Sequence, residues 1–156
     1  MIFQYSTKLA IRAALFLAQQ APGKLSPVHE IAAHLGVSEA YLAKVTQRLV
    51  STGLVRSFRG PGKGLELRRA PEKITLAVVV HAVQGSLDSD NCVLGREMCS
   101  EENPCALHSE WLPLRKRFSD LLEKTTLADL VRSGHQGDEA IVPFDLIGLG
   151  EKRRRR

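Results

Sequence analysis

The chain lacks an apolar run of about 18 residues, the length that a membrane-spanning helix needs, so no membrane partner is expected. Residues 1–20 lack the clean apolar block and the small-residue cleavage pattern of a targeting segment, and we interpret most of them as an amphipathic helix. The sequence shows no nucleophile–base pair and no glycine-rich phosphate loop. These absences predict a cytoplasmic protein that is not an enzyme and has no small-molecule substrate.

Cysteine is scarce, and all three cysteines lie between positions 92 and 105. Cytoplasmic proteins seldom keep structural disulfides, so clustered cysteines in that compartment are more often metal ligands or redox groups. The cluster therefore marks a candidate site for metal binding or redox chemistry.

Charge is distributed unevenly along the chain. Residues 1–80 hold eleven lysines and arginines against four acidic residues, a net charge of +7. Residues 81–150 hold six against twelve, a net charge of −6, and the ending EKRRRR brings the whole chain to +5. A basic first half is typical of a nucleic-acid-binding module, although a solvated surface without a special purpose has the same charge.

The basic half contains the pattern of a helix-turn-helix. Apolar spacing predicts a helix over residues 6–20, and Pro27 suits the start of a second, short helix. Gly36 permits a sharp turn, and Ser38 can cap a third helix over about residues 39–52. Two helices joined by a tight glycine-containing turn are the arrangement that places a recognition helix in the major groove of DNA.

The outer face of this third helix carries short polar and basic side chains, which suit contacts with DNA bases and phosphates. The candidates are Ser38, Glu39, Tyr41, Lys44, Gln47 and Arg48. An ordinary helical hairpin that binds no DNA is the alternative interpretation of this segment.

A β-hairpin is predicted directly after the recognition helix. Residues 54–58 and 65–68 have strand-like composition, and the turn between them is rich in glycine. Arg56, Arg59 and Lys63 are the basic candidates of this hairpin for contact with a phosphate backbone or a narrow minor groove. The prediction is a winged helix-turn-helix.

The second half is expected to be helical. Residues 74–83 are nearly all apolar and predict a buried helix or a buried strand, and residues 107–124 predict a long helix. Apolar residues of the long helix recur every three or four positions and therefore form one stripe on its surface. Few other segments remain in so small a domain to cover this stripe, which predicts that it packs against a second copy of the chain. The stripe consists of Trp111, Leu114, Phe118 and Leu121.

These elements divide the chain into four predicted regions. Residues 1–84 form the DNA-binding domain, residues 85–106 a cysteine-containing loop, residues 107–133 the dimerisation helix region, and residues 134–156 a flexible basic tail. A short helix follows the long one near residue 127, where Thr126 and Asp129 have capping-box spacing.

The combination of motifs resembles the IscR/NsrR-type family of bacterial winged-helix transcription regulators, also called the Rrf-two family, over about residues 1–132. The resemblance rests on EIAAHLGVSEAYLAKVTQRLVSTGLVRSFRGPGKG, on ITL and TTLADL, and on the cysteine loop between them. It implies a homodimer that binds double-stranded operator DNA, usually as a repressor, and holds an iron–sulfur cluster when the cysteines are present. Ala43 and Leu65 replace an acidic and an aromatic residue common in the family, which leaves the operator sequence open.

The loop residues Cys92, Cys99, Cys105 and His108 follow the spacing C-x6-C-x5-C-x2-H. Structural zinc sites use closer cysteine pairs, whereas wide intervals suit a loop wrapped around a larger group such as an iron–sulfur cluster. His108 is the nearest candidate for a fourth ligand. Four acidic residues remain alternative oxygen ligands: Asp90, Glu97, Glu101 and Glu102.

The histidine resembles the family branch that holds a 2Fe-2S cluster through three cysteines and one histidine. The 4Fe-4S branch uses an acidic residue near the N-terminus, where this chain has Lys8. The first cysteine interval is one residue longer than the histidine branch implies, so a 4Fe-4S cluster stays open as well. Cluster-free thiols that act as a redox switch, a zinc site, and an iron–sulfur electron-transfer protein are the competing hypotheses.

Overall fold

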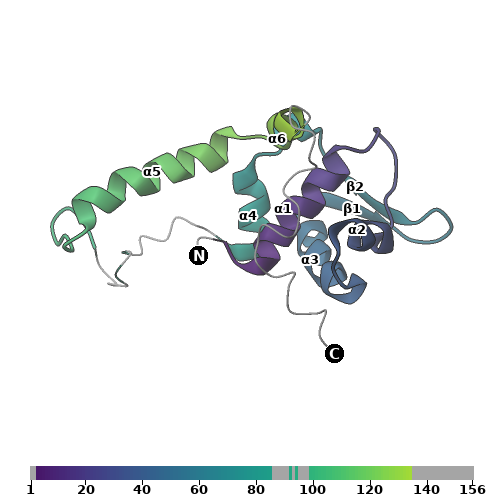
Figure 1. Cartoon of the computed structure of the whole chain (residues 1–156), viewed down its shortest axis with the longest axis horizontal. Coiled ribbons are helices and arrows are strands. Elements are labelled where there is room, and N and C mark those ends of the chain that lie inside the picture. Colours follow the sequence, from purple (N-terminus) through teal and green to yellow (C-terminus); the bar gives the residue numbers. More distant parts are fainter. Residues whose placement is uncertain (1–2, 86–91, 93, 95–98, 135–156) are drawn as a thin grey trace.

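The computed structural model describes residues 3–85, 92, 94 and 99–134, and these form a mainly helical protein with one small hairpin (Figure 1). The predicted tail therefore lies outside the described residues, apart from Gly134. The elements are α1 (Tyr5–Ala18), α2 (Val28–Leu35), α3 (Glu39–Ser51), β1 (Val55–Phe58), β2 (Gly64–Leu67), the 3-10 turn η1 (Pro71–Lys73), α4 (Leu76–Gln84), α5 (His108–Lys124) and α6 (Leu127–Gly134). Within the described parts of the chain, no helix is both long and apolar enough to cross a bilayer.

Helix α1 is the centre of the core. Its small residues Ala10, Ala13 and Ala14 have no exposed surface, so α3, α4 and α6 can approach the α1 backbone closely. Leu9 of the same helix is also buried. We call the part built around α1, residues 3–84, the head.

The helix-turn-helix is confirmed. Gly36 ends α2 in the left-handed conformation, with φ 66° and ψ 34°, which glycine adopts without a steric penalty. Ser38 then caps α3, because its Oγ accepts a hydrogen bond of 3.3 Å from the backbone N–H of Tyr41. The inner face of α3 is buried through Leu42 and Leu49, both of which have no exposed surface.

The predicted hairpin is also confirmed, with β1 and β2 antiparallel and Val55 opposite Leu67. We call it the wing. Leu65 exchanges two backbone hydrogen bonds with Ser26, 2.8 and 3.0 Å long, and these tie the wing to the segment before α2. Glycine is required beside this contact, because a Cβ on Gly64 would lie 2.9 Å from the backbone N and C of Ser26. The wing is thereby held at a defined place beside the recognition helix.

Most of the apolar segment 74–83 forms helix α4, which begins at Leu76, and not a strand. Beyond it, α5 extends away from the head as a single long helix, and α6 folds back against α1 (Figure 1). The return is fixed by Leu127, which is fully buried and whose N–H donates to the Ile74 carbonyl at 2.8 Å. The capping box is confirmed, since Thr126 N donates to Asp129 Oδ2 at 2.9 Å and Asp129 N donates to Thr126 Oγ1 at 3.1 Å.

Candidate functional site

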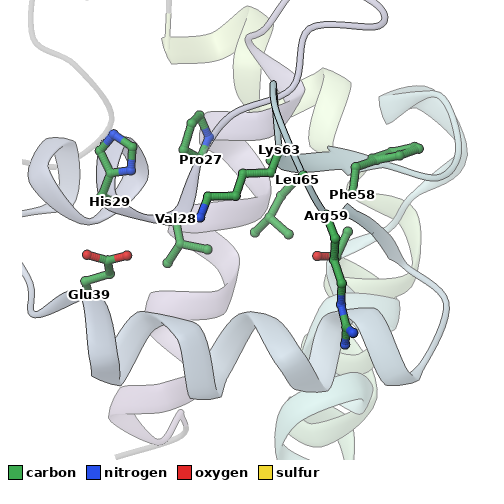
Figure 2. A pocket seen from close by; sticks show the side chains of 11 residues that line it. Pro27, Val28, His29, Glu39, Phe58, Arg59, Lys63 and Leu65 are labelled. Atoms are coloured by element: carbon green, nitrogen blue, oxygen red, sulfur yellow. The ribbon is translucent and has the colours of Figure 1, made fainter.

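The start of α3, the start of α2 and the wing enclose a groove of about 400 Å³ (Figure 2). Its lining brings together three of the predicted DNA-binding residues, Glu39 from α3 and Arg59 and Lys63 from the wing tip. Figure 2 shows Arg59 and Lys63 extending from the same hairpin in different directions, so their charges lie on two sides of the groove. The groove combines a helix N-terminus with two long cationic side chains, which suits a polyanion.

Other predicted DNA-binding residues have partners within the head. The Arg48 Nη1 donates a hydrogen bond of 3.0 Å to the Val83 carbonyl near the C-terminal end of α4. Arg56 pairs with Glu66 across the wing, with 3.0 Å between Nη2 and Oε1. Both arginines therefore bind other residues of the head. Lys44, in contrast, is exposed on the outer face of α3.

Tyr41 also has a neighbour inside the head, since its ring stacks on that of Tyr5 with 5.7 Å between ring centroids. Lining residues that were not predicted from the sequence include His29 at the start of α2 and Phe58, whose surface is 42% exposed. An exposed aromatic residue next to Arg59 was the available signal for Phe58. No sequence signal marked His29, because only the fold brings the start of α2 beside the wing.

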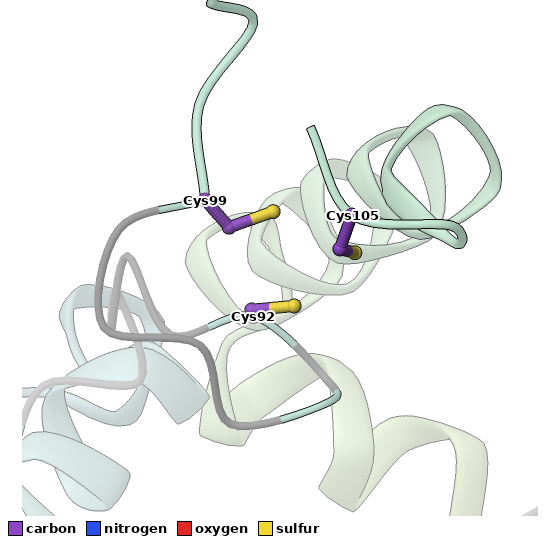
Figure 3. Close-up of side chains that lie close together, drawn as sticks. All are labelled: Cys92, Cys99 and Cys105. Atoms are coloured by element: carbon purple, nitrogen blue, oxygen red, sulfur yellow. The ribbon is translucent and has the colours of Figure 1, made fainter. Parts of the chain in front are cut away.

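The side chains of the three cysteines converge near the start of α5 (Figure 3). Their Sγ atoms all lie within 4.8 Å of one another. Cys92 and Cys105 are buried and Cys99 is half-buried, and no disulfide joins these three described cysteines. A wide loop has thus placed three soft donors at mutual distances that one metal centre can bridge.

Without a positively charged group beside it, the buried Cys105 thiol favours its neutral form. Hydrogen bonding with Cys92 and then burial raise the pKa of the Cys105 thiol, because both make its thiolate costly relative to the neutral thiol. A positively charged metal centre removes this penalty, since thiolates bind it directly. The donor set therefore matches a thiolate-preferring metal or cluster.

His108 lies beside this cysteine triad. Its Nδ1 is 3.2 Å from the Cys99 Sγ. The group of atoms that all lie within 4.8 Å of one another consists of the three sulfur atoms and does not include a His108 nitrogen. Cys92, Cys99 and His108 line a cavity of about 260 Å³ at the start of α5, which we call the triad cavity. Its other lining residues are Ser100, Glu101, Trp111, Leu112 and Arg115.

Two buried nitrogens at the triad cavity lack a hydrogen-bond partner among the described residues, the Nε2 of His108 and the Nε1 of Trp111. Buried polar groups are normally paired, so these two nitrogens are available to a group other than the described residues. Of the alternative oxygen ligands, Glu101 lines the cavity, Glu102 is not part of the lining, and Asp90 and Glu97 lie outside the described residues.

The predicted dimer stripe on α5 is split between two environments. Trp111 lines the triad cavity, and Phe118 packs against Phe3 with 5.7 Å between ring centroids. Leu114 and Leu121 remain 57% and 58% exposed. Leu107, which was not predicted as a dimer residue, is 44% exposed. It precedes Leu114 by seven residues, and Leu114 precedes Leu121 by the same interval.

Comparison with known proteins agrees with this arrangement. Residues 3–133 match the Rrf2 family, an iron-dependent transcriptional regulator. The chain is 35% identical over 147 residues to the HTH-type transcriptional regulator IscR of Erwinia tasmaniensis, covering 94% of this chain and 86% of that protein.

Solved structures show the same fold. The IscR structure from T. potens has a TM-score of 0.69 at 26% identity, and the comparison covers 90% of this chain and 93% of that one. CymR, the global cysteine regulator of B. subtilis, has a TM-score of 0.73 at 24% identity, covering 84% and 96%. The winged helix-turn-helix, the cysteine triad that could hold a cluster and the match along most of the chain lead to one conclusion: this protein belongs to the Rrf2 family of DNA-binding transcription regulators and is not an enzyme.

Proposed function

We propose that two copies of this chain bind operator DNA, and that an iron–sulfur cluster held by Cys92, Cys99 and Cys105 controls the affinity. The observation that carries the proposal is the convergence of all three Sγ atoms within 4.8 Å at one end of α5. The other end of α5 leads into α6, which packs against α1, so α5 connects the cysteine site with the head that carries the DNA-binding surface.

The DNA-binding surface consists of the outer face of α3 and the wing. Glu39 and Lys44 lie on the exposed side of α3, and Arg59 and Lys63 on the wing tip. In this proposal α3 enters the major groove, while the wing follows the backbone or the minor groove beside it. Arg48, Arg56 and Tyr41 keep these elements in place through their contacts within the head.

Dimerisation is proposed through the exposed leucines of α5. Leu114 and Leu121 of α5 and Leu107, the N-cap residue before it, are spaced seven residues apart, and the rest of the exposed surface of α5 is mainly polar. A seven-residue repeat is self-complementary when two helices pair, so a second copy is the occupant that fits it. Two-fold symmetry would place the two recognition helices about 34 Å apart, one turn of DNA.

The cluster would be ligated by the three cysteines and, as the fourth ligand, His108. This donor set favours a 2Fe-2S cluster, because imidazole replaces a thiolate in known clusters of that type. When bound, the cluster would supply a redox-active centre that joins the loop to α5 and that oxidants can destroy. Cys92, Cys99 and Cys105 would then hold the loop against the first turn of α5, and without a bound group this constraint on the helix is lost.

The connection to DNA follows from the position of α5. Because α5 carries both the dimer leucines and His108, a change in its first turn alters how the two copies pair and therefore how the two α3 helices are spaced. The effect is limited by the difference in cluster affinity between the two DNA-binding states. A coupling of about 1–3 kcal/mol, or roughly 5–150-fold in affinity, is typical of such linkage.

The decisive experiment compares the wild type with Cys99→Ala, His108→Ala and the control Ser100→Ala after anaerobic reconstitution. Ser100 lines the same cavity and is a poor ligand for iron, so this control should keep full iron and sulfide. We expect Cys99→Ala to lose the cluster and to change its affinity for duplex DNA that the wild type selects from a random pool. Full iron and sulfide in Cys99→Ala, or equal DNA affinity of the apo and holo wild type, would overturn the proposal.

A cluster-free thiol switch is the second candidate, favoured by the same close approach of the three sulfur atoms. Vicinal thiols at this distance can form a disulfide after a small movement. The two candidates separate in cluster-free wild type, in which the thiol switch requires that oxidation by a disulfide reagent changes DNA affinity. Iron and zinc analysis of the protein isolated without oxygen distinguishes both from a zinc site.

A further inference from the structure

We propose that the indole N–H of Trp111 donates a hydrogen bond to a sulfur atom of the group bound at the cysteine triad, and that this bond sets the reduction potential of that group. The inference rests on the proposed function, because it needs a cluster at the triad. It gives Trp111 a positioning role at the metal site, in place of the dimer contact predicted from its spacing on α5.

The first observation is the unpaired indole nitrogen. The Nε1 atom of Trp111 is buried and has no hydrogen-bond partner among the described residues. An indole N–H can only donate, and a buried donor without an acceptor destabilises the folded state. Trp111 lines the same cavity as the sulfur atoms of Cys92 and Cys99, so a sulfur-rich acceptor would lie within the space that the indole borders.

The second observation is the relation of Trp111 to His108. Residues three apart in a helix lie on the same face, and His108 and Trp111 belong to the first turn of α5. The backbone N–H of Trp111 donates to the Leu107 carbonyl at 2.8 Å, which fixes the start of this turn. His108 points its Nδ1 at the Cys99 Sγ, at 3.2 Å, so the shared face of the turn is directed toward the triad.

The consequence for the bound group follows from charge. Hydrogen bonds to the sulfurs of an iron–sulfur cluster stabilise the more negative, reduced state and therefore raise its reduction potential. The Trp111 indole adds one such bond without adding a charge or a competing ligand. Its removal should move the potential to a more negative value while the ligands stay in place.

Trp111→Phe tests this inference, since it keeps an aromatic ring in the cavity and removes the donor. The matched control is Leu112→Ala, which changes the packing of the same cavity but removes no donor. We expect Trp111→Phe to keep the iron and sulfide content and the dimeric state of the wild type, with a more negative midpoint potential in a mediated redox titration. An unchanged potential, or an equal shift in Leu112→Ala, would overturn the inference.

The wild type offers an independent readout, because Trp111 is the one tryptophan of the chain. Its fluorescence should be quenched in proportion to the iron incorporated during reconstitution. Unquenched emission from fully loaded protein would place the indole away from the bound group and overturn the inference, even if Trp111→Phe does not fold. If the wild type binds no iron and sulfide at all, the proposed function fails as well, whereas a normal cluster with an unshifted variant removes only the role of Trp111.

Discussion

The head and the arm formed by α5 differ in how they are stabilised. In the head, α1, α3 and α4 bury a continuous set of apolar side chains, and Leu49 and Val79 have no exposed surface. In α5, only Leu122 is buried, at the end near the head, while Leu114 and Leu121 are more than half exposed. The head thus has a buried core, which Leu127 of α6 completes, whereas α5 has apolar side chains that a single copy leaves exposed.

The two halves of the chain also differ in charge. Residues 1–80, which contain the winged helix-turn-helix, carry a net charge of +7, and residues 81–150, which contain the cysteines and α5, carry a net charge of −6. Attraction to phosphate is therefore concentrated on the head. In the proposed function, the head supplies the affinity for DNA, while α5 sets how two heads are arranged on it.

The largest expected effect comes from a cavity in the head. Leu49→Ala removes a fully buried side chain from the inner face of α3 and should lower the free energy of unfolding by about 2–5 kcal/mol. Leu121→Ala is the matched change in the arm, and with 58% of its surface exposed it should cost less than about 0.5 kcal/mol in dilute, monomeric protein. Urea unfolding of both variants measures this, and equal losses would show that the two regions do not differ as described.

The next effect concerns pairing of the arms. Replacing Leu114 and Leu121 together by serine should leave the fold of the head intact but shift the protein to monomer, because both side chains lie on the exposed seven-residue repeat. Sedimentation at micromolar concentration measures the shift, with circular dichroism as the test for folding. A double variant that remains a dimer would place the dimer contact elsewhere.

A smaller effect is expected for a single wing cation. Arg59→Ala should weaken DNA binding and reduce the slope of log affinity against log salt by about 0.9 for each phosphate that the arginine neutralises in the wild type. Affinity measured over a series of salt concentrations tests this. Arg56→Ala serves as the contrast, since Arg56 is already paired with Glu66 and should change the slope less.

Glu39 should act on sequence preference more than on total affinity. A carboxylate in a groove with Arg59 and Lys63 repels phosphate but can accept a hydrogen bond from a cytosine amino group. We expect Glu39→Gln to bind random duplex DNA more tightly and to discriminate less among sequences. Selection from a random DNA pool by both proteins measures it, and identical selected sequences would exclude Glu39 from base recognition.

The smallest effect is the pH dependence at the start of α6. Hydrogen bonds from the Thr126 side chain and backbone, followed by Arg132, lower the pKa of Asp129 to about 2, below the value of about 3.9 for an unfolded chain. The ionised carboxylate therefore stabilises the fold fully above about pH 4, and this contribution is lost as the pH falls toward 2. Thermal unfolding between pH 2 and 5 should show a flatter profile for Asp129→Asn, and an unchanged profile would contradict the assignment.

Several features of the fold could be predicted because they depend on neighbouring residues. The turn at Gly36, the cap at Ser38, the wing and the capping box of Thr126 and Asp129 each follow from local backbone geometry. Segment 74–83 could not be assigned in the same way. It is apolar almost throughout, so it has no polar face to reveal its period, and only packing against α1 shows that it is a helix.

The candidate sites also have features that could be predicted from the sequence and features that could not. The sequence by itself determined which residues carry the chemistry, because only one loop holds cysteines and the basic residues cluster in the first half. The tertiary structure decided what those residues touch: it directs Arg48 to the end of α4, sets Trp111 beside the triad and leaves Leu107 exposed in line with Leu114. Spacing in a sequence fixes the face of a helix on which a side chain lies, but the partner on that face is supplied by segments far away in the chain.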